Sequence, residues 1–183
     1  MPVQKGFTLL ELVITVAIAA IVVGLAAPSF SNMIQDNRLS SQTLDFVAAL
    51  NLARSEAIKR RTRVALCKSR NEADCSSNNG DWEQGWIVFV DNNGNNQRDG
   101  GETILRVHGP LSGNNTLAGN HNFSNFIAYS PSGSSTQFGT MSLCDPRRDN
   151  SKGKAIRINR TGRVMVSTIE EAISDGRKPR TCT

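Results

Sequence analysis

Lys5-Gly6-Phe7-Thr8-Leu9-Leu10-Glu11 opens the stretch of sequence that decides the fold. From Phe7 to Ala27 every residue is apolar or small, except for two threonines and one glutamate. As an α-helix, which rises about 1.5 Å per residue, this segment would be about 30 Å long, the thickness of the hydrocarbon layer of a membrane. We therefore expect residues 7–27 to form a transmembrane helix.

Glu11 is the one charged residue in this apolar segment. A charge at membrane depth costs about 3 kcal/mol or more, so a carboxylate placed there needs a partner. Two interpretations are open from the residues alone. Either Glu11 pairs with a positive group, or it lies at the end of the helix and reaches water.

The residues before the apolar segment, Lys5-Gly6 followed by Phe7, resemble a class III, prepilin-type signal. A secretory signal would instead place small residues at a cleavage site after its apolar core. The resemblance implies that a prepilin peptidase cuts between Gly6 and Phe7, removes a leader of residues 1–6 and methylates the new Phe7 amine. It also implies a partner for Glu11, the Phe7 amino group of a neighbouring subunit, which sets the register as subunits enter a filament.

Residues 28–61 continue the helix with a different pattern. Apolar residues, among them Phe30, Leu44, Val47 and Ile58, now recur at steps of three and four, as in an amphipathic helix. We expect one helix from about residue 7 to residue 60, its first half in the membrane and its second half packed under a head.

Short segments rich in Val, Ile, Phe and Thr predict β-strands in the head. They are residues 63–68, 85–91, 103–108, 125–130, 136–144, 154–159 and 163–168. Because no helices remain for parallel crossovers, the sheets should be antiparallel. Residues 160–163 predict a hairpin turn between the last two strands. Residues 112–122 are expected to form a polar loop and residues 170–183 a tail.

Three parts of the chain resemble the GspH/FimT branch of the pilin-like proteins. They are Ala53-Arg54-Ser55-Glu56-Ala57-Ile58-Lys59 with Val64-Ala65-Leu66-Cys67, Gly85-Trp86-Ile87-Val88-Phe89-Val90-Asp91 with Asp99-Gly100-Gly101-Glu102, and Arg160-Thr161-Gly162-Arg163. This family comprises the minor pseudopilin H of type II secretion and the minor pilins T and U of type IV pili. The resemblance implies an α+β, pilin-like fold, with one long N-terminal helix packed on two antiparallel sheets. It also implies a low-abundance subunit at or near a filament tip.

Four cysteines in a chain anchored by its N-terminus predict an oxidising compartment and two disulfides, hence a periplasmic head of residues 62–183. Of the three possible pairings we expect Cys67–Cys75, which would clip a loop, and Cys144–Cys182, which would pin the tail to a strand. Free buried thiols are the alternative. The cysteine spacings do not form the paired CxxC pattern of a zinc site, so we expect no metal there.

The net charge of +5 lies entirely between Met141 and Thr183, because 11 Lys or Arg residues balance 11 Asp or Glu residues up to Thr140. The tail carries three cations around a proline, and two arginines of the preceding hairpin extend the basic patch. Phosphate oxygens are natural partners of such a set, Arg by bidentate geometry and Lys as a point charge. The candidate DNA-binding residues are Arg177, Lys178, Arg180, Arg160 and Arg163.

Minor pilins T that serve DNA uptake resemble this chain in having a Gly-Arg-x-Arg motif in a disulfide-tethered C-terminal tail. Here the second arginine comes one residue later, in Gly176-Arg177-Lys178-Pro179-Arg180. The resemblance implies binding of double-stranded DNA in natural transformation. Because no aromatic residue for base stacking is expected nearby, the contacts should go to phosphates and be independent of sequence. The alternatives are a solvated tail, or a tail that faces an acidic neighbouring subunit.

Two further features suggest other chemistry. Residues 91–102 resemble a calcium loop in their oxygen-bearing side chains, but position 6 is Asn96 rather than Gly and no helices flank the loop. A β-hairpin connection explains the same residues. His108 and His121 are isolated, so we expect neither an enzyme nor a cofactor. Trp82 and Trp86 are expected to form a core or rim pair.

The sequence therefore predicts a minor pilin of a type IV pilus. We expect it to cross the bacterial inner membrane once, with its head in the periplasm, and to join other minor and major pilins at or near the filament tip. There it would prime assembly, and its basic patch would bind DNA. The alternative is the minor pseudopilin H of type II secretion, acting in protein export.

Overall fold

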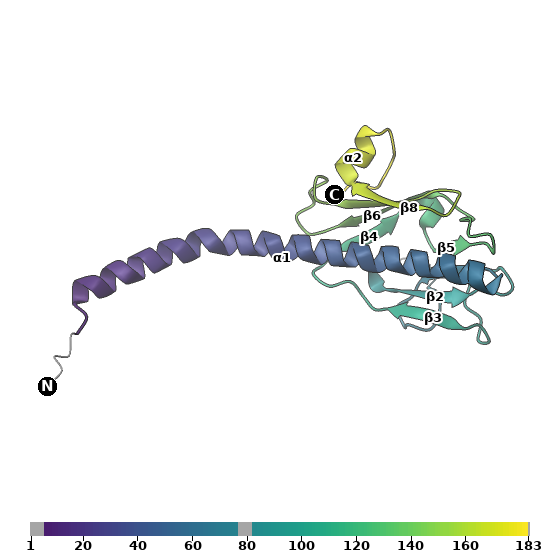
Figure 1. Cartoon of the computed structure of the whole chain (residues 1–183), viewed down its shortest axis with the longest axis horizontal. Helices are drawn as coiled ribbons and strands as arrows, with labels where there is room; N and C mark the ends of the chain where they lie inside the picture. The colour runs from purple at the N-terminus through teal and green to yellow at the C-terminus, as the bar shows by residue number, and fades with distance from the viewer. Residues whose placement is uncertain (1–5, 77–81, 183) are drawn as a thin grey trace. The chain divides into compact units, whose positions relative to one another are not determined.

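The structure is a computed structural model that describes residues 6–76 and 82–182 of the 183-residue chain. Of residues 25–28 and His121 it describes the backbone alone. The chain divides into two units, Met1–Asn37 and Arg38–Thr183, and each is described by itself. Figure 1 labels the helices and strands.

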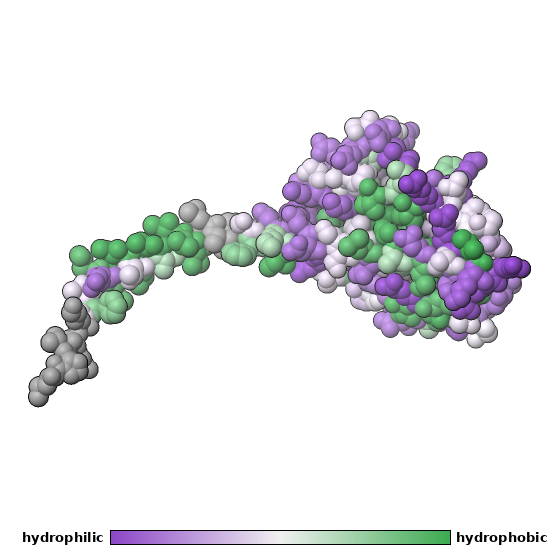
Figure 2. Space-filling view, viewed as in Figure 1, coloured by the Kyte–Doolittle hydropathy of each residue, from purple (hydrophilic) through white to green (hydrophobic). Residues whose placement is uncertain are grey.

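The first unit is the N-terminal part of helix α1 (Leu9–Arg60). Its apolar side chains are exposed, and residues as far apart as Leu9, Val16 and Val23 each expose more than half of their surface. Figure 2 shows this apolar surface in green. By length and composition, α1 contains a segment able to cross a membrane. Apolar surface of this extent is stable against lipid or against other helices rather than in water.

The second unit begins with the C-terminal part of α1, which has one buried face. Phe46, Leu50 and Ala57 are fully buried, whereas Leu44 and Ile58 are exposed. With Ala53 between Leu50 and Ala57, the buried positions follow one another at intervals of three and four residues, so this part of the helix is amphipathic. Leu44 and Ile58, which were expected to belong to the apolar pattern, lie on the exposed side instead.

The first of two four-stranded sheets has the order β3-β2-β1-β5, and all of its strands are antiparallel. Its strands are β1 (Val64–Lys68), β2 (Trp86–Val90), β3 (Ile104–His108) and β5 (Phe126–Tyr129). Every residue of β1 and β2 is buried. These central strands are covered on both faces, which explains their continuous apolar sequence.

The second sheet has the order β4-β6-β7-β8 and is also antiparallel. Its strands are β4 (Thr116–Gly119), β6 (Gly139–Cys144), β7 (Lys154–Ile158) and β8 (Val164–Thr168). In β6, Met141 and Leu143 belong to the main core, while Thr140, Ser142 and Cys144 alternate with them and face the other side. That other face carries the C-terminal tail.

One core joins α1 to both sheets. Phe46 of α1 packs edge-to-face on Trp82 and Trp86, with ring centres 5.7 and 5.1 Å apart. Both tryptophans are fully buried, and the Trp82 indole N–H donates to the Phe123 carbonyl at 2.8 Å. The tryptophans are therefore core residues. The expected α+β fold, with a long N-terminal helix and a head of two antiparallel sheets, is confirmed.

Two expectations about the head were wrong. The polar loop expected at residues 112–122 contains β4, an edge strand of four residues with just Leu117 and Ala118 buried. So short a strand gives no alternating pattern, and pairing with β6 supplies its stability. The expected tail begins with a helix, α2 (Ile169–Ser174), which starts at a capping box of Thr168 and Glu171. The Thr-x-x-Glu spacing is a sequence signal for that start.

Candidate functional sites at the two ends of the chain

The start of α1 is built around Thr8 and Glu11. The Thr8 backbone N–H and hydroxyl both donate to Glu11 Oε2 at 3.1 Å, and the Glu11 N–H donates to Thr8 Oγ1 at 3.2 Å. This reciprocal pair is a capping box, which satisfies N–H groups that the first turn of a helix leaves without partners. Glu11 therefore lies at the end of the helix and has a partner within its own chain.

The residues at the expected cleavage position are accessible. Phe7 exposes 89% of its surface, and no atom lies within 4 Å of the position that a Cβ on Gly6 would occupy. Lys5 lies outside the described residues. Cleavage between Gly6 and Phe7, and the pairing of Glu11 with the Phe7 amine of another subunit, stay predictions.

The C-terminal tail is fastened to the outer face of the second sheet. Cys144 of β6 is disulfide-bonded to Cys182, with Cα atoms 5.6 Å apart. The Cys182 N–H also donates to the Asn150 side chain at 2.9 Å. A small apolar cluster of β6, β7, α2 and tail residues lies beneath: Cys144, Ala155, Ile169, Ala172 and Cys182. The tail between α2 and Cys182 is thus held at both of its ends.

Between those two ends, the tail cations line two different clefts. The first, which we call the Phe138 cleft, has a volume of about 470 Å³. It is lined by Phe138, Gly139, Thr140, Arg157, Ile158, Asn159, Arg160, Arg177 and Lys178. The second, the Arg180 cleft, has a volume of about 250 Å³. It is lined by Thr116, Ala118, Ser142, Cys144, Asp145, Arg148, Arg180, Thr181 and Cys182.

The structure brings together three of the five cations expected to bind DNA. Arg160, Arg177 and Lys178 line the Phe138 cleft, whereas Arg180 lines the other cleft. Arg163 is exposed just before β8 and lines neither of the two. The longer spacing between the two tail arginines therefore accompanies a division of their side chains between neighbouring clefts.

Neighbouring carboxylates reduce the net positive charge of this region. Asp175 forms an ion pair with Arg177 at 3.0 Å, and Asp145 is bound to Arg147. Hydrogen bonds from the Ser151 hydroxyl and then from the Ser151 backbone N–H lower the pKa of Asp149, so this carboxylate stays ionised at neutral pH. The charge available to a phosphate is therefore lower than a count of cations suggests.

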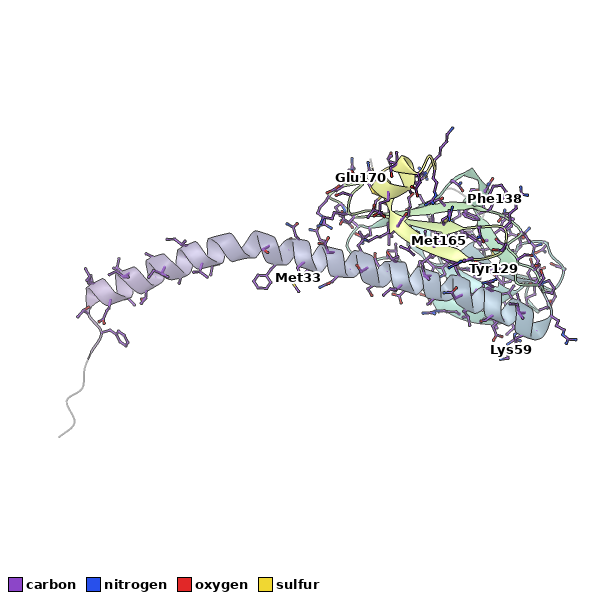
Figure 3. All side chains as sticks on the ribbon, turned by 45° about the horizontal axis from the view of Figure 1, so that its top comes forward. Met33, Lys59, Tyr129, Phe138, Met165 and Glu170 are labelled. Carbon is purple, nitrogen blue, oxygen red and sulfur yellow. A yellow bond between two sulfur atoms is a disulfide. The ribbon has the colours of Figure 1, made fainter. Side chains whose placement is uncertain are left out.

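Phe138 is the site residue that the sequence did not reveal. No aromatic residue was expected near the basic residues, and that expectation was wrong. Phe138 exposes 47% of its surface, and the Arg160 guanidinium carbon lies 4.5 Å from the centre of its ring (Phe138 is labelled in Figure 3). The two residues are far apart in sequence, but the pairing of Gly139 with Ile158 sets them side by side. The register of the β6–β7 pair was the missing information.

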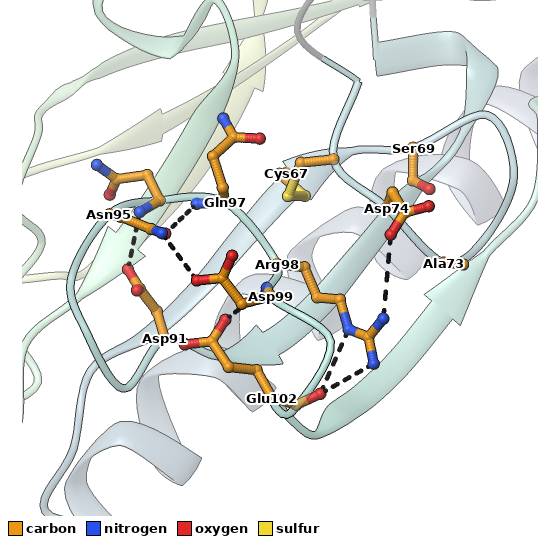
Figure 4. Close-up of a disulfide and its surroundings, with 12 residues drawn as sticks. Cys67, Ser69, Ala73, Asp74, Asp91, Asn95, Gln97, Arg98, Asp99 and Glu102 are labelled. Atoms are coloured by element: carbon orange, nitrogen blue, oxygen red, sulfur yellow. Dashed lines mark hydrogen bonds and ion pairs between the residues drawn. A yellow bond between two sulfur atoms is a disulfide. The ribbon is translucent and has the colours of Figure 1, made fainter.

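In the loop that resembles a calcium site, the carboxylates are engaged by groups of the protein itself (Figure 4). Asp91 is buried and forms an ion pair with Arg63 at 2.9 Å. The Glu102 carboxylate accepts hydrogen bonds from the backbone N–H groups of Asn92 at 2.7 Å and Asp99 at 3.0 Å. The loop connects β2 to β3, as a hairpin connection does. The parts of the chain that the structure describes hold no group of three His, Cys, Asp or Glu residues suited to a metal ion.

The other disulfide closes the loop that follows β1. Cys67 is bonded to Cys75, with Cα atoms 5.5 Å apart (Figure 4). Both pairings expected from the sequence are thus present in the structure, which contains no free cysteine among the residues that it describes.

Comparison with known proteins gives two family matches. The family described as type II transport protein GspH matches residues 42–162, and the prokaryotic N-terminal methylation motif matches residues 1–27. Pilin-like protein PilA1 of Thermus thermophilus is 31% identical over 107 residues. That match covers 57% of this chain and 60% of PilA1, so it spans less than two thirds of the relative's length.

The fold is similar to that of the type IV minor pilin FimU of Pseudomonas aeruginosa (strain PAO1). One crystal form of FimU gives a TM-score of 0.59 at 19% identity and covers 80% of this chain and 96% of FimU. A second form gives a TM-score of 0.56 at 18% identity, covering 79% and 99%. At these identities the likeness concerns the fold.

Proposed function

Because this chain belongs to the family of the type II transport protein GspH, we propose that it is a minor pilin of a type IV pilus. In this role it joins other minor and major pilins at or near the filament tip and primes assembly. One observation carries the proposal: an accessible Gly6–Phe7 bond directly precedes a long, exposed apolar helix with a capped glutamate in its first turn. The fold shared with the minor pilin FimU supports it.

Processing turns the precursor into a subunit. Prepilin peptidase cleaves between Gly6 and Phe7, removes leader residues 1–6 and methylates the new Phe7 amine. Residues 7–27 stay in the inner membrane, residues 28–61 continue the helix, and residues 62–183 form the periplasmic head. The two disulfides suit that compartment, because disulfides persist where the surroundings are oxidising.

In assembly, Glu11 accepts a hydrogen bond from a neighbouring subunit, and its own hydrogen bonds determine which carboxylate oxygen does so. Both hydrogen bonds from Thr8 go to Oε2, which leaves Oε1 to accept from the Phe7 ammonium of a neighbouring subunit. Cleavage after Gly6 removes neither Thr8 nor Glu11, so the capping box survives processing. The box keeps the carboxylate satisfied in the membrane until the neighbouring ammonium arrives, because an unpaired charge there is costly.

We further propose that the head binds double-stranded DNA through its tail cations and thereby serves DNA uptake in natural transformation. Arg160, Arg177 and Lys178 line one cleft and Arg180 lines the other, so a DNA strand crossing both would meet cations in each. Because the tail is fastened at Cys182, it loses little freedom on binding.

Binding of duplex DNA across a salt series tests this second proposal. The full chain in detergent micelles should lose affinity linearly in log salt, with a slope of about −0.9 per phosphate neutralised. An Arg177→Ala/Arg180→Ala variant should flatten that slope by about two units. Arg70→Ala is the matched control. Arg70 is an exposed cation in the loop between Cys67 and Cys75, and its loss should change the salt slope far less. No binding at low salt, or equal slopes for wild type and tail variant, would refute DNA binding by the tail.

The alternative is a minor pseudopilin of type II secretion, which the description of the matching family favours. Deleting the coding gene in the cells that carry it separates the two. Loss of surface filaments and of transformation, with secreted proteins unchanged, supports the pilus. Accumulation of secreted proteins inside the cell, with filaments intact, supports the secretion system and overturns the first proposal.

A further inference from the structure

The Phe138 cleft combines an exposed aromatic ring with several cations. Phe138 stands just before β6, exposes 47% of its surface and carries the Arg160 guanidinium over its ring at 4.5 Å (Figure 3). A phenylalanine is normally buried, and an exposed one in a cleft has no role in the core. The guanidinium lies over the ring, yet nearly half of the surface of Phe138 stays exposed, which leaves room for contact with a second planar group.

The other residues that line the cleft come from two strands and from the basic part of the tail. Gly139, Thr140 and Ile158 of strands β6 and β7 line it, and Arg157, Arg177 and Lys178 add three cations to Arg160. None of the residues that line the cleft is acidic. Asp175, which is not a lining residue, forms an ion pair with Arg177 at 3.0 Å. The cleft therefore suits a ligand that is flat and apolar at one end and negative at the other.

Arg157 adds an unmatched donor to the site. Its Nη2 contacts the Met165 sulfur at 2.7 Å, but its Nε is buried without a hydrogen-bond partner. Arg157 and Phe138 line the same cleft, so one ligand could contact both residues.

We propose that the Phe138 cleft binds an unpaired base of single-stranded DNA, stacked on Phe138, with the adjoining phosphates on Arg160, Arg177 and Lys178. Stacking on aromatic rings together with a positively charged groove is how proteins hold single strands with little sequence preference. The volume of about 470 Å³ lies within the range of small-ligand sites, so one base fits. A base inside a duplex is covered on both faces, so it cannot stack here without leaving the helix.

This inference rests on the proposed binding of DNA and makes it more specific. Phosphate contacts alone treat a strand with bases and a strand without bases alike. Stacking on Phe138 instead makes the protein prefer unpaired bases, such as those at a frayed or single-stranded end. The head would then bind duplex DNA through charge and hold its end through the ring.

Three probes of equal length separate these contributions: single-stranded oligothymidine, the same backbone with abasic sites throughout, and a duplex. The full chain in detergent micelles is titrated with each probe at low salt, and binding is followed by fluorescence anisotropy. We expect oligothymidine to bind at least about fivefold more tightly than the abasic strand, because base stacking contributes at this scale or above. Equal affinity for these two strands would overturn the inference and leave charge-based binding of DNA standing.

Substitutions assign the preference to the ring. Phe138→Leu should bring oligothymidine to the affinity of the abasic strand while leaving abasic binding and its salt dependence within about twofold of wild type. Arg177→Ala/Lys178→Ala should weaken both strands, since phosphates are common to both. Val107→Ala, an exposed apolar position on β3 of the other sheet, is the control and should change neither.

The outcomes also distinguish failure of this inference from failure of the proposed DNA binding on which it rests. If Phe138→Leu keeps the wild-type preference for bases, the ring is not the stacking site and the inference is wrong. If no probe binds wild type at low salt, the proposed DNA binding fails and the inference fails with it. If all three probes bind with equal affinity, the stacking inference is wrong, but the proposed DNA binding still stands.

Discussion

Glu11 reconciles two requirements that conflict in a membrane. The proposed assembly role needs a carboxylate at a fixed depth, but a lone charge in lipid is unstable. The hydrogen bonds from Thr8 answer this, because they turn the carboxylate into part of the helix cap. The sequence showed the charge and the length of the apolar segment. It did not show the capping box, although Thr8-Leu9-Leu10-Glu11 has the spacing of one.

Glu11→Gln separates the cap from the charge. Glutamine at this position can still accept from the Thr8 N–H, so the helix should form and the variant should reach the membrane in normal amount. Without a negative charge it cannot form an ion pair with the Phe7 ammonium of a neighbour. We expect its share of a sheared filament fraction, measured by immunoblot, to fall at least about tenfold, the effect of 1.4 kcal/mol.

Thr8→Val is the matched control. It keeps the charge of Glu11 and removes the threonine hydroxyl from the capping box. Loss of an N-cap costs about 1 kcal/mol, which the membrane helix should tolerate. This variant should therefore enter filaments far better than Glu11→Gln. Equal incorporation of Glu11→Gln and wild type would remove the charge of Glu11 from the account of assembly.

Among the elements, the tail is the one whose stability depends most on a covalent bond. The Cys144–Cys182 bridge joins residues 38 positions apart, whereas Cys67–Cys75 joins residues 8 apart. By the loop-entropy relation, the first contributes about 4 kcal/mol to the free energy of unfolding and the second about 2.5 kcal/mol. The order follows from loop length, because the longer bridge removes more freedom from the unfolded chain.

Paired cysteine-to-serine variants test that order. Cys144→Ser/Cys182→Ser should lower the midpoint of guanidinium unfolding more than Cys67→Ser/Cys75→Ser does. The fluorescence of Trp82 and Trp86 is the readout, since both are buried in the head and report on its core rather than on the membrane segment. A larger loss from the short bridge would show that contacts within its loop, not chain entropy, determine its contribution.

The turn between β7 and β8 requires a glycine at position 162. Gly162 has φ +77°, and a Cβ there would lie 2.2 Å from the Gly133 carbonyl oxygen. Arg54 of α1 donates to that same carbonyl at 2.9 Å and to the Thr161 carbonyl at 3.0 Å. One side chain of the helix thus ties together turns from both sheets.

Gly162→Ala should therefore destabilise the head by about 1–3 kcal/mol, because the backbone conformation is unfavourable for alanine and the carbonyl must move. Thermal unfolding followed by tryptophan fluorescence measures the loss. Gly100→Ala is the control, since no atom lies within 4 Å of its Cβ position. A variant at Gly162 as stable as wild type would mean that the contact between the two turns is not tight.

How far the sequence predicted these elements depended on the strength of the local pattern. The helix and seven strands were found to within a few residues, because apolar periodicity and turn residues mark them. β4 was missed, since four residues with two buried side chains carry no pattern. The disulfides were expected from cysteine positions. The Phe138 cleft was not expected, because it depends on strand register between residues remote in sequence.

For the molecule as a whole, the proposed assembly role and the proposed DNA binding would depend on different units of the chain. The apolar helix and Glu11 belong to the first unit, while the excess positive charge lies after Thr140 in the second. Substitutions in one unit should therefore leave the function of the other intact.

The Arg177→Ala/Arg180→Ala variant tests this separation in cells. It should appear in sheared filaments at the wild-type level, because its helix is unchanged, while transformation frequency falls at least about tenfold. Transformation is measured with purified genomic DNA in a strain whose own gene is replaced. If filaments are lost together with transformation, the tail takes part in assembly and the two functions are not separable.

The most direct test of the central claim is the intact mass of the full-length protein purified from the membranes of cells that make it. A processed pilin subunit should begin at Phe7 and carry one added methyl group. Gly6→Val is the control and should keep residues 1–6, since the space around Gly6 lets the variant fold while the peptidase loses its glycine. A wild-type mass that includes Met1 to Gly6, or one that corresponds to cleavage after the apolar segment, would contradict the account.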